Sequence, residues 1–120
     1  MSHDKKIEWI LRIGAAAEFA GHGILAIQGK ADWIKWISML TGAEATTATT
    51  VLLAVGIMDV ILALVVLIRP FNPFLIWMAV WGFWTALVRP LVGMSWLDFV
   101  ERGANWATPL ALYFFYRSKK

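Results

Sequence analysis

Four long, mainly apolar segments constrain this chain more than any other feature of its sequence. They cover about residues 7–28, 47–68, 74–91 and 96–116. A helix needs about 20 predominantly apolar residues to cross the hydrocarbon core of a bilayer. In addition, 60% of all residues are hydrophobic and only 16% are charged. We therefore predict an all-α fold, an integral membrane bundle of four transmembrane helices that forms a single domain over residues 1–120.

The connections between these segments differ in character. Residues 31–40 alternate aromatic, apolar and basic side chains around Lys35, which predicts a short amphipathic helix at the membrane surface between the first two spans. Pro70 and Pro73 disfavour a continuous helix and predict a turn. In the fourth segment, the uncharged stretch 103–116 is short for a span. We expect residues 96–102 to complete it, with their charges facing protein.

The distribution of lysine and arginine predicts the orientation of the bundle. With four spans, both termini lie on the side that carries six basic residues: Lys5, Lys6, Arg69, Arg117, Lys119 and Lys120. The other side carries Lys30, Lys35, Arg89 and Arg102. This bias favours cytoplasmic termini. The basic residues form no aromatic-interleaved face of the kind that binds nucleic acid. The absence of cysteine excludes thiolate metal sites, and no other metal-ligand spacing appears.

Ionisable residues inside the first two spans are candidates for a ligand or proton site. Glu18 and His22 lie in the first span and Asp59 in the second. Charged groups at this depth normally face the bundle interior and a partner. Glu18 and His22 are four residues apart, so either they hydrogen-bond to each other and lock the bundle, or they serve a substrate or a proton. Asp59 either pairs with Arg12 or another helix, or belongs to the same site.

A second polar group is expected where the third and fourth segments meet. Asp98, Glu101, Arg102 and Asn105 fall on one side of a helix, and Arg89 lies near the end of the third segment. These residues either form a structural ion-pair network or contribute to the ligand or proton site.

Aromatic residues predict a surface on which a flat molecule could stack. Trp77, Trp81 and Trp84 recur at helical spacing in the third segment, and Trp106 could contribute from the fourth. Such a stripe either packs against neighbouring helices or contacts a quinone, an isoprenoid or lipid.

His22 offers a different ligand chemistry. It stands between two glycines, and a neutral imidazole is a common metal ligand, so it could hold a haem or a chlorophyll-type pigment. Because His22 is the only histidine within the spans, a bis-histidine haem inside one chain is excluded.

The sequence resembles the DoxX-like family of small four-helix bacterial membrane proteins. The resemblance covers about residues 7–116, and its motifs are Arg12, Gly21–Gly23, Gly56, Asp59, Thr85–Gly93, Glu101–Trp106 and Pro109–Leu112. Members of this family look like membrane partners of redox enzymes, including a small subunit of a thiosulfate:quinone oxidoreductase and components of oxidative-stress complexes. The resemblance implies a place in the bacterial inner membrane but supplies no catalytic motif that can be transferred to individual residues.

Three functions are therefore expected. The first is a non-catalytic membrane subunit or anchor of a quinone-linked redox complex, in contact with lipid and with other membrane subunits or further copies of itself. The second is a small proton-coupled transporter, similar in architecture to small multidrug-resistance exporters, in which Glu18 is the coupling carboxylate. The third is a pigment- or haem-binding subunit that uses His22.

Overall fold

The computed structural model describes residues 2–119 and confirms the all-α prediction, because no strand occurs in this range. Three of the helices, α1, α3 and α4, are long and apolar enough to cross a membrane. The elements in chain order are α1 (His3–Ile27), α2 (Ala31–Thr41), α3 (Ala45–Ile68), α4 (Asn72–Leu91), α5 (Trp96–Val100) and α6 (Ala104–Arg117).

The short helix predicted in the first connection and the turn predicted in the second are both confirmed. Helix α2 occupies the segment expected to form the short amphipathic helix, and a glycine with positive φ flanks it on each side: Gly29 at 74° and Gly42 at 76°. Glycine adopts this left-handed conformation without the steric cost of a Cβ. The proline-containing turn separates α3 from α4, with Pro73 in the first turn of α4. There the missing proline N–H costs no helical hydrogen bond.

The fourth apolar segment is not the single continuous helix that we predicted over residues 96–116. Helix α5 ends at Val100, residues 101–103 form a turn, and α6 begins at Ala104. Gly103 lies in this break, where its weak helix propensity favours interruption. Helix α6 has 14 residues and is therefore about 21 Å long. This is shorter than the roughly 30 Å of a bilayer core.

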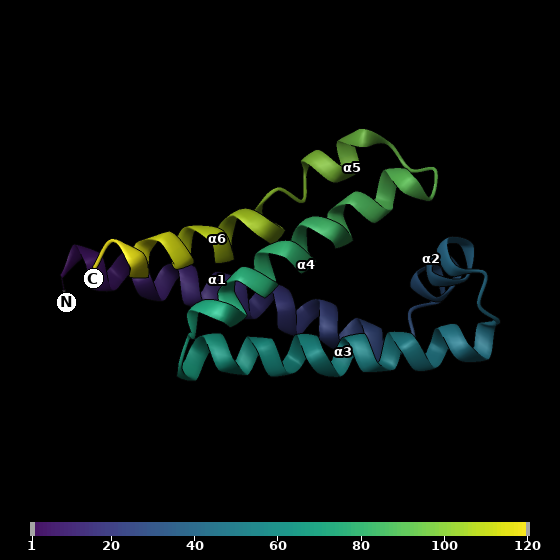
Figure 1. Cartoon of the computed structure of the whole chain (residues 1–120), viewed down its shortest axis with the longest axis horizontal. Helices are drawn as coiled ribbons and strands as arrows, with labels where there is room; N and C mark the ends of the chain where they lie inside the picture. The colour runs from purple at the N-terminus through teal and green to yellow at the C-terminus, as the bar shows by residue number, and fades with distance from the viewer. Residues whose placement is uncertain (1, 120) are drawn as a thin grey trace.

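The long helices run along a molecule about 50 Å in length. Figure 1 shows both termini and the α3–α4 turn at one end, and helices α2 and α5 at the other. Helix α1 packs along α3, and α4 packs along α6. Helices α3 and α4 start close together at their shared turn and diverge toward α2 (Figure 1). The bundle is therefore closed at the end that holds the termini and splayed at the other.

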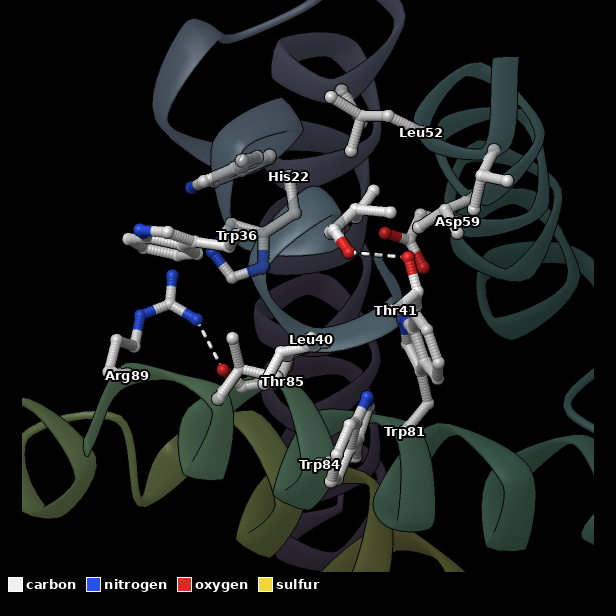
Figure 2. Close-up of a pocket in the computed structure, with 16 residues that line it drawn as sticks. His22, Trp36, Leu40, Thr41, Leu52, Asp59, Trp81, Trp84, Thr85 and Arg89 are labelled. Atoms are coloured by element: carbon white, nitrogen blue, oxygen red, sulfur yellow. Dashed lines mark hydrogen bonds between the residues drawn. The ribbon is translucent and has the colours of Figure 1, made fainter. Parts of the chain in front are cut away.

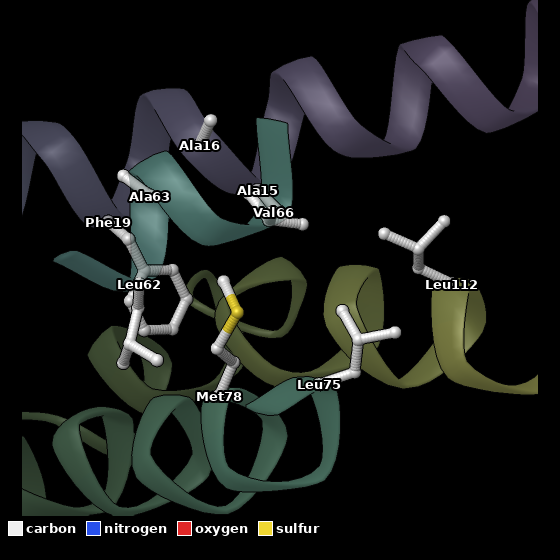
Figure 3. Close-up of a cluster of buried hydrophobic side chains, with 9 residues drawn as sticks. All are labelled: Ala15, Ala16, Phe19, Leu62, Ala63, Val66, Leu75, Met78 and Leu112. Atoms are coloured by element: carbon white, nitrogen blue, oxygen red, sulfur yellow. The ribbon is translucent and has the colours of Figure 1, made fainter. Parts of the chain in front are cut away.

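A hydrophobic core closes the end of the bundle that holds the termini (Figure 3). Helices α1, α3, α4 and α6 all contribute to it. Leu75, Met78 and Leu112 have no exposed surface. The remaining members are Ala15, Ala16, Phe19, Leu62, Ala63 and Val66. This packing fixes α1, α3, α4 and α6 relative to one another at the end that holds the termini. It therefore also positions the polar residues that the same helices carry nearer α2.

Arg12 caps the end of α3 and does not pair with Asp59, so that alternative for Asp59 is excluded. Its Nε donates to the carbonyl oxygen of Val66 at 2.9 Å, and its Nη2 donates to the carbonyl of Leu67. The last carbonyls of a helix have no intrahelical donor, and a guanidinium can serve several of them at once. Arg12 is only 7% exposed, so this capping occurs inside the bundle.

Glu8 completes the network around Arg12 at this end. Arg12 Nη1 lies 3.4 Å from Glu8 Oε2, and the hydroxyl of Tyr116 donates to the same oxygen at 2.6 Å. Lys5 Nζ lies 3.2 Å from Glu8 Oε1. The network links α1 to the ends of α3 and α6, far from the polar residues of the splayed end.

Candidate functional site

A pocket of about 260 Å³ opens where α3 and α4 diverge, and helices α1 and α2 complete its walls (Figure 2). Its walls are largely apolar. Four tryptophans and a few polar side chains interrupt them: Trp33, Trp36, Trp81 and Trp84, with His22, Thr41, Asp59, Thr85 and Arg89. An apolar cavity with a few convergent polar groups is the usual form of a ligand site. The pocket therefore brings together five sequence-predicted site residues: His22, Asp59, Arg89, Trp81 and Trp84.

Asp59 supplies the carboxylate of the pocket from the middle of α3. It is 4% exposed, and its Oδ1 has no hydrogen-bond partner in residues 2–119. The indole of Trp81 lies beside this carboxylate (Figure 2), and its buried Nε1 likewise has no hydrogen bond of normal geometry. A buried polar atom that lacks a partner is costly. The two groups therefore mark a polar position that packing within the described chain leaves unsatisfied.

Arg89 supplies the positive charge of the pocket from the last turn of α4. Its Nη1 donates to the carbonyl of Thr85, and its guanidinium carbon lies 5.2 Å from the centre of the Trp36 ring. Cations are favoured at a helix C-terminus and over the face of a tryptophan. The side chain is nevertheless 4% exposed, and its Nε has no partner among the described residues.

The ion-pair network predicted for Arg89 with Asp98, Glu101 and Arg102 does not form. In residues 2–119, the side-chain ion pairs within 4.0 Å are Lys5–Glu8, Arg12–Glu8 and Lys119–Asp4, all at the other end of the bundle. The break at residues 101–103 explains the difference, because it interrupts the helix face that would have aligned these charges, and Glu101 is exposed. Asp98 and Glu101 lie near enough to Arg89 for their charges to interact, but among the described residues neither carboxylate lies within ion-pair distance of it.

Glu18 and His22 do not share a site in the structure. His22 lines the pocket and meets Trp33 edge to face, with ring centres 5.7 Å apart. Glu18 is half-buried and does not line the pocket. The hydrogen bond expected between them does not form. Arg102 lies near enough to Glu18 for their charges to interact, although the pair does not reach ion-pair distance.

Asn105 and Arg102 lie outside the pocket but are also incompletely satisfied. Asn105 is 7% exposed and its Nδ2 has no partner, and the same is true of Arg102 Nε within the described chain. Both come from the start of α6 and the break before it. The sequence placed them on one helix face with Glu101, and the structure instead leaves Glu101 at the surface.

The tryptophan stripe of α4 divides between two roles. Trp77 and Trp81 stack, with ring centres 5.7 Å apart and planes inclined by 24°. Trp77 donates from Nε1 to the sulfur of Met58 at 3.4 Å, and so packs against α3. Trp81 and Trp84 line the pocket. Trp106, expected to join them, instead lies edge-on to the ring of Phe83, with centres 6.0 Å apart.

Two aromatic residues of the pocket were not singled out as site residues from the sequence. Trp33 and Trp36 belong to residues 31–40, which were predicted to form an amphipathic helix at the membrane surface, and both line the pocket. They stand three residues apart on a helix, so they share one face. That spacing is the signal that could have identified them, because it directs two aromatic rings toward the helices on which α2 packs.

Searches for related proteins return nothing against which this site can be compared: no protein-family model, no curated protein and no solved structure matches the chain.

Proposed function

We propose that this protein is a small integral membrane subunit or anchor that binds the headgroup of a quinone-type lipid and associates with a quinone-linked redox complex. The supporting observation is the pocket between α2, α3 and α4. It combines four tryptophans with two buried, incompletely satisfied ionisable side chains, Asp59 and Arg89. Aromatic faces suit a flat ring, and the two polar side chains suit its oxygens.

The size of the pocket favours one ring over a macrocycle. About 260 Å³ is below the roughly 300–1,000 Å³ of sites that enclose drug-sized ligands. A single-ring headgroup fits this volume, with its isoprenoid tail leaving between the splayed helices. A tetrapyrrole on His22 would need more room, and the ring of Trp33 stands edge-on against that imidazole. A proton-coupled transporter that uses Glu18 also gains little support, since Glu18 lies outside the pocket.

We further propose that the chain crosses the membrane four times, with both termini in the cytoplasm of a bacterial cell. The termini and the α3–α4 turn lie at one end of the bundle, and α2 and α5 lie at the other (Figure 1). The first three crossings would be α1, α3 and α4. Helix α6 would make the fourth together with α5 and the turn between them. Helix α2 would lie at the membrane surface, with Trp33 and Trp36 facing the pocket.

Cysteine labelling tests the four crossings. The chain has no cysteine, so each of Glu44→Cys, Arg69→Cys, Met94→Cys and Ser118→Cys introduces the only thiol. A membrane-impermeant maleimide should label positions 44 and 94 in intact spheroplasts, and positions 69 and 118 only after permeabilisation. Labelling of positions 94 and 118 from the same side would show that α5 and α6 do not cross.

The composition of the native complex tests the functional proposal. The tagged full-length chain is extracted with a mild detergent from the cells that produce it naturally. Its proteins are then identified by mass spectrometry, and its lipids by solvent extraction and chromatography. We expect larger redox subunits and quinone in the same fraction. A stable monomer free of quinone and of partner proteins would overturn the proposal, which also includes membership of the DoxX-like family.

A further inference from the structure

Two orphaned polar atoms of opposite character occupy opposite sides of the pocket. Asp59 Oδ1 and Arg89 Nε both lack a hydrogen-bond partner within residues 2–119, and both residues are 4% exposed. Figure 2 shows Asp59 on the α3 side and Arg89 on the α4 side, with the ring of Trp36 over the guanidinium. Both residues line the cavity. A ligand that satisfies both must therefore carry a polar atom at each end.

The chemistry of the two side chains specifies those atoms. A guanidinium can only donate hydrogen bonds, and an ionised carboxylate can only accept them. A protonated carboxyl keeps an acceptor oxygen as well as its donor, so only the ionised form of Asp59 constrains the ligand. With Asp59 ionised, the ligand must present an acceptor to Arg89 and a donor to Asp59. The oxidised form of a quinone offers two carbonyl acceptors and no donor, so it satisfies one end alone.

We propose that the pocket prefers the reduced, hydroxyl-bearing form of a quinone-type ring. One hydroxyl donates to Asp59, and the opposite oxygen accepts from Arg89. This inference rests on the proposed function and adds to it which redox form is held. It makes Asp59 the residue that discriminates between the two forms, and Arg89 the residue that binds both.

The magnitude follows from the hydrogen bond that the oxidised ring cannot make. A hydrogen bond to a charged group in a buried site changes affinity by about tenfold to a hundredfold. We therefore expect the reduced ring to bind about 10 to 100 times more tightly than the oxidised ring. A protonated Asp59 could donate to the oxidised ring and still accept from the reduced ring, so the preference would be lost, as it would be in Asp59→Asn.

The preference is measured by anaerobic equilibrium dialysis of the purified full-length chain in detergent. The probes are a short-chain benzoquinone, its hydroquinone, and the dimethyl ether of that hydroquinone. The dimethyl ether keeps both acceptor oxygens but has no donor, and it cannot be oxidised to the quinone under these conditions. The expected order is tight binding of the hydroquinone and weaker binding of the other two. Equal affinity for all three, or tighter binding of the quinone, would overturn the inference.

Variants separate this preference from general binding. Asp59→Asn has nearly the same shape but supplies both a donor and an acceptor, so it should bind the hydroquinone and the quinone within about threefold of each other. Arg89→Gln should weaken both forms together. The matched control is Glu44→Gln, because Glu44 is an exposed acidic residue that does not line the pocket, and it should leave the preference unchanged. Retention of the full preference by Asp59→Asn would assign it to another residue.

The outcomes also distinguish this inference from the proposed function. If the native complex contains quinone but the purified chain shows no preference for the hydroquinone, only the inference fails. If neither ring form binds and no quinone accompanies the native complex, the quinone assignment fails and the inference fails with it. Should Asp59→Asn not fold, the comparison of the hydroquinone with its dimethyl ether on the unmodified chain still decides the question.

Discussion

Gly23 of α1 and Gly56 of α3 face each other where the two helices cross, and each leaves room for the backbone of the other. A Cβ on Gly23 would lie 2.8 Å from the carbonyl oxygen of Gly56, and a Cβ on Gly56 would lie 2.7 Å from the carbonyl oxygen of Gly23. Small residues let membrane helices approach until their backbones touch. This crossing therefore sets the spacing of α1 and α3 next to the pocket, since Asp59 follows Gly56 by one turn of α3.

Gly56→Ala should destabilise the protein by forcing α1 and α3 apart. The added methyl would also lie 2.9 Å from the backbone nitrogen of Ile27. It therefore meets the α1 backbone at two points, and no rotamer change can relieve that contact. Overpacking of this kind costs about 1–3 kcal/mol. Unfolding in mixed micelles with increasing sodium dodecyl sulfate measures the loss. Gly21→Ala is the matched control, since a Cβ there meets nothing within 4 Å. Equal stability of the two variants would contradict the crossing.

Gly82→Ala should separate α4 from α6. A Cβ on Gly82 would lie 2.1 Å from the carbonyl oxygen of Asn105. That oxygen is exposed to a neighbouring helix because residue 109 is a proline, which has no N–H to donate to it. We expect a loss of at least the roughly 1–3 kcal/mol of ordinary overpacking, with faster proteolysis between α5 and α6. Gly14→Ala is the control, because its Cβ would meet only Thr108 Cγ2, at 4.0 Å.

Arg12→Met should leave the last carbonyls of α3 without their buried donor and remove the buried cation beside Glu8. Breaking one side of a buried, hydrogen-bonded charge pair costs about 3–5 kcal/mol. Tyr116→Phe removes only the single hydrogen bond to Glu8 and should cost about 1.5–3 kcal/mol. The same unfolding titration in sodium dodecyl sulfate compares the two. A cost for Arg12→Met no larger than that of Tyr116→Phe would show that the α3 carbonyls do not depend on Arg12.

Helix α2 should be less stable than α1, α3, α4 and α6, the other helices of more than two turns. None of its 11 residues is buried, and an isolated helix of this length is marginal. Hydrogen–deuterium exchange in detergent should therefore be faster over residues 31–41 than over α1 or α3. Protection of α2 equal to that of α3 would contradict this expectation.

Trp36→Leu should accelerate exchange in α2 further by removing the aromatic face that lies over the Arg89 guanidinium. A cation–π contact contributes about 0.5–2 kcal/mol, which corresponds to roughly a two- to thirtyfold faster opening. Arg89→Gln should have a similar effect, and the double variant should add little to either single one. Additive effects of the two substitutions would show that the residues do not act through each other.

The helices of the first three apolar segments could be predicted because their signals are local. Apolar length, two prolines and the amphipathic pattern around Lys35 are written in consecutive residues, and they placed α1 to α4 within a few residues of their observed ends. The fourth segment was harder. Its uncharged stretch, residues 103–116, is short for a span, and we extended it with residues 96–102. The turn at residues 101–103 separates these two parts.

The candidate site could be predicted only in part for a related reason. Inspection of single helices identifies which ionisable residues fall within a span. It selected His22, Asp59 and Arg89, which line the pocket, and also Glu18, which does not. It cannot say which partner each one meets. Arg12 was considered as a partner of Asp59 because their charges are opposite. In the structure, Arg12 instead donates its hydrogen bonds to the carbonyls at the end of α3. The role of Trp36 likewise depends on where α2 folds.

The sequence by itself determined that this chain is helical, rich in segments suited to a membrane, and supplied with a few ionisable residues inside them. These properties depend on composition and on spacing along one helix. The tertiary structure decided which of those residues share a cavity. That outcome depends on the angle at which α3 and α4 diverge and on glycine contacts such as Gly23 with Gly56, which join residues far apart in the chain and leave no pattern within either segment.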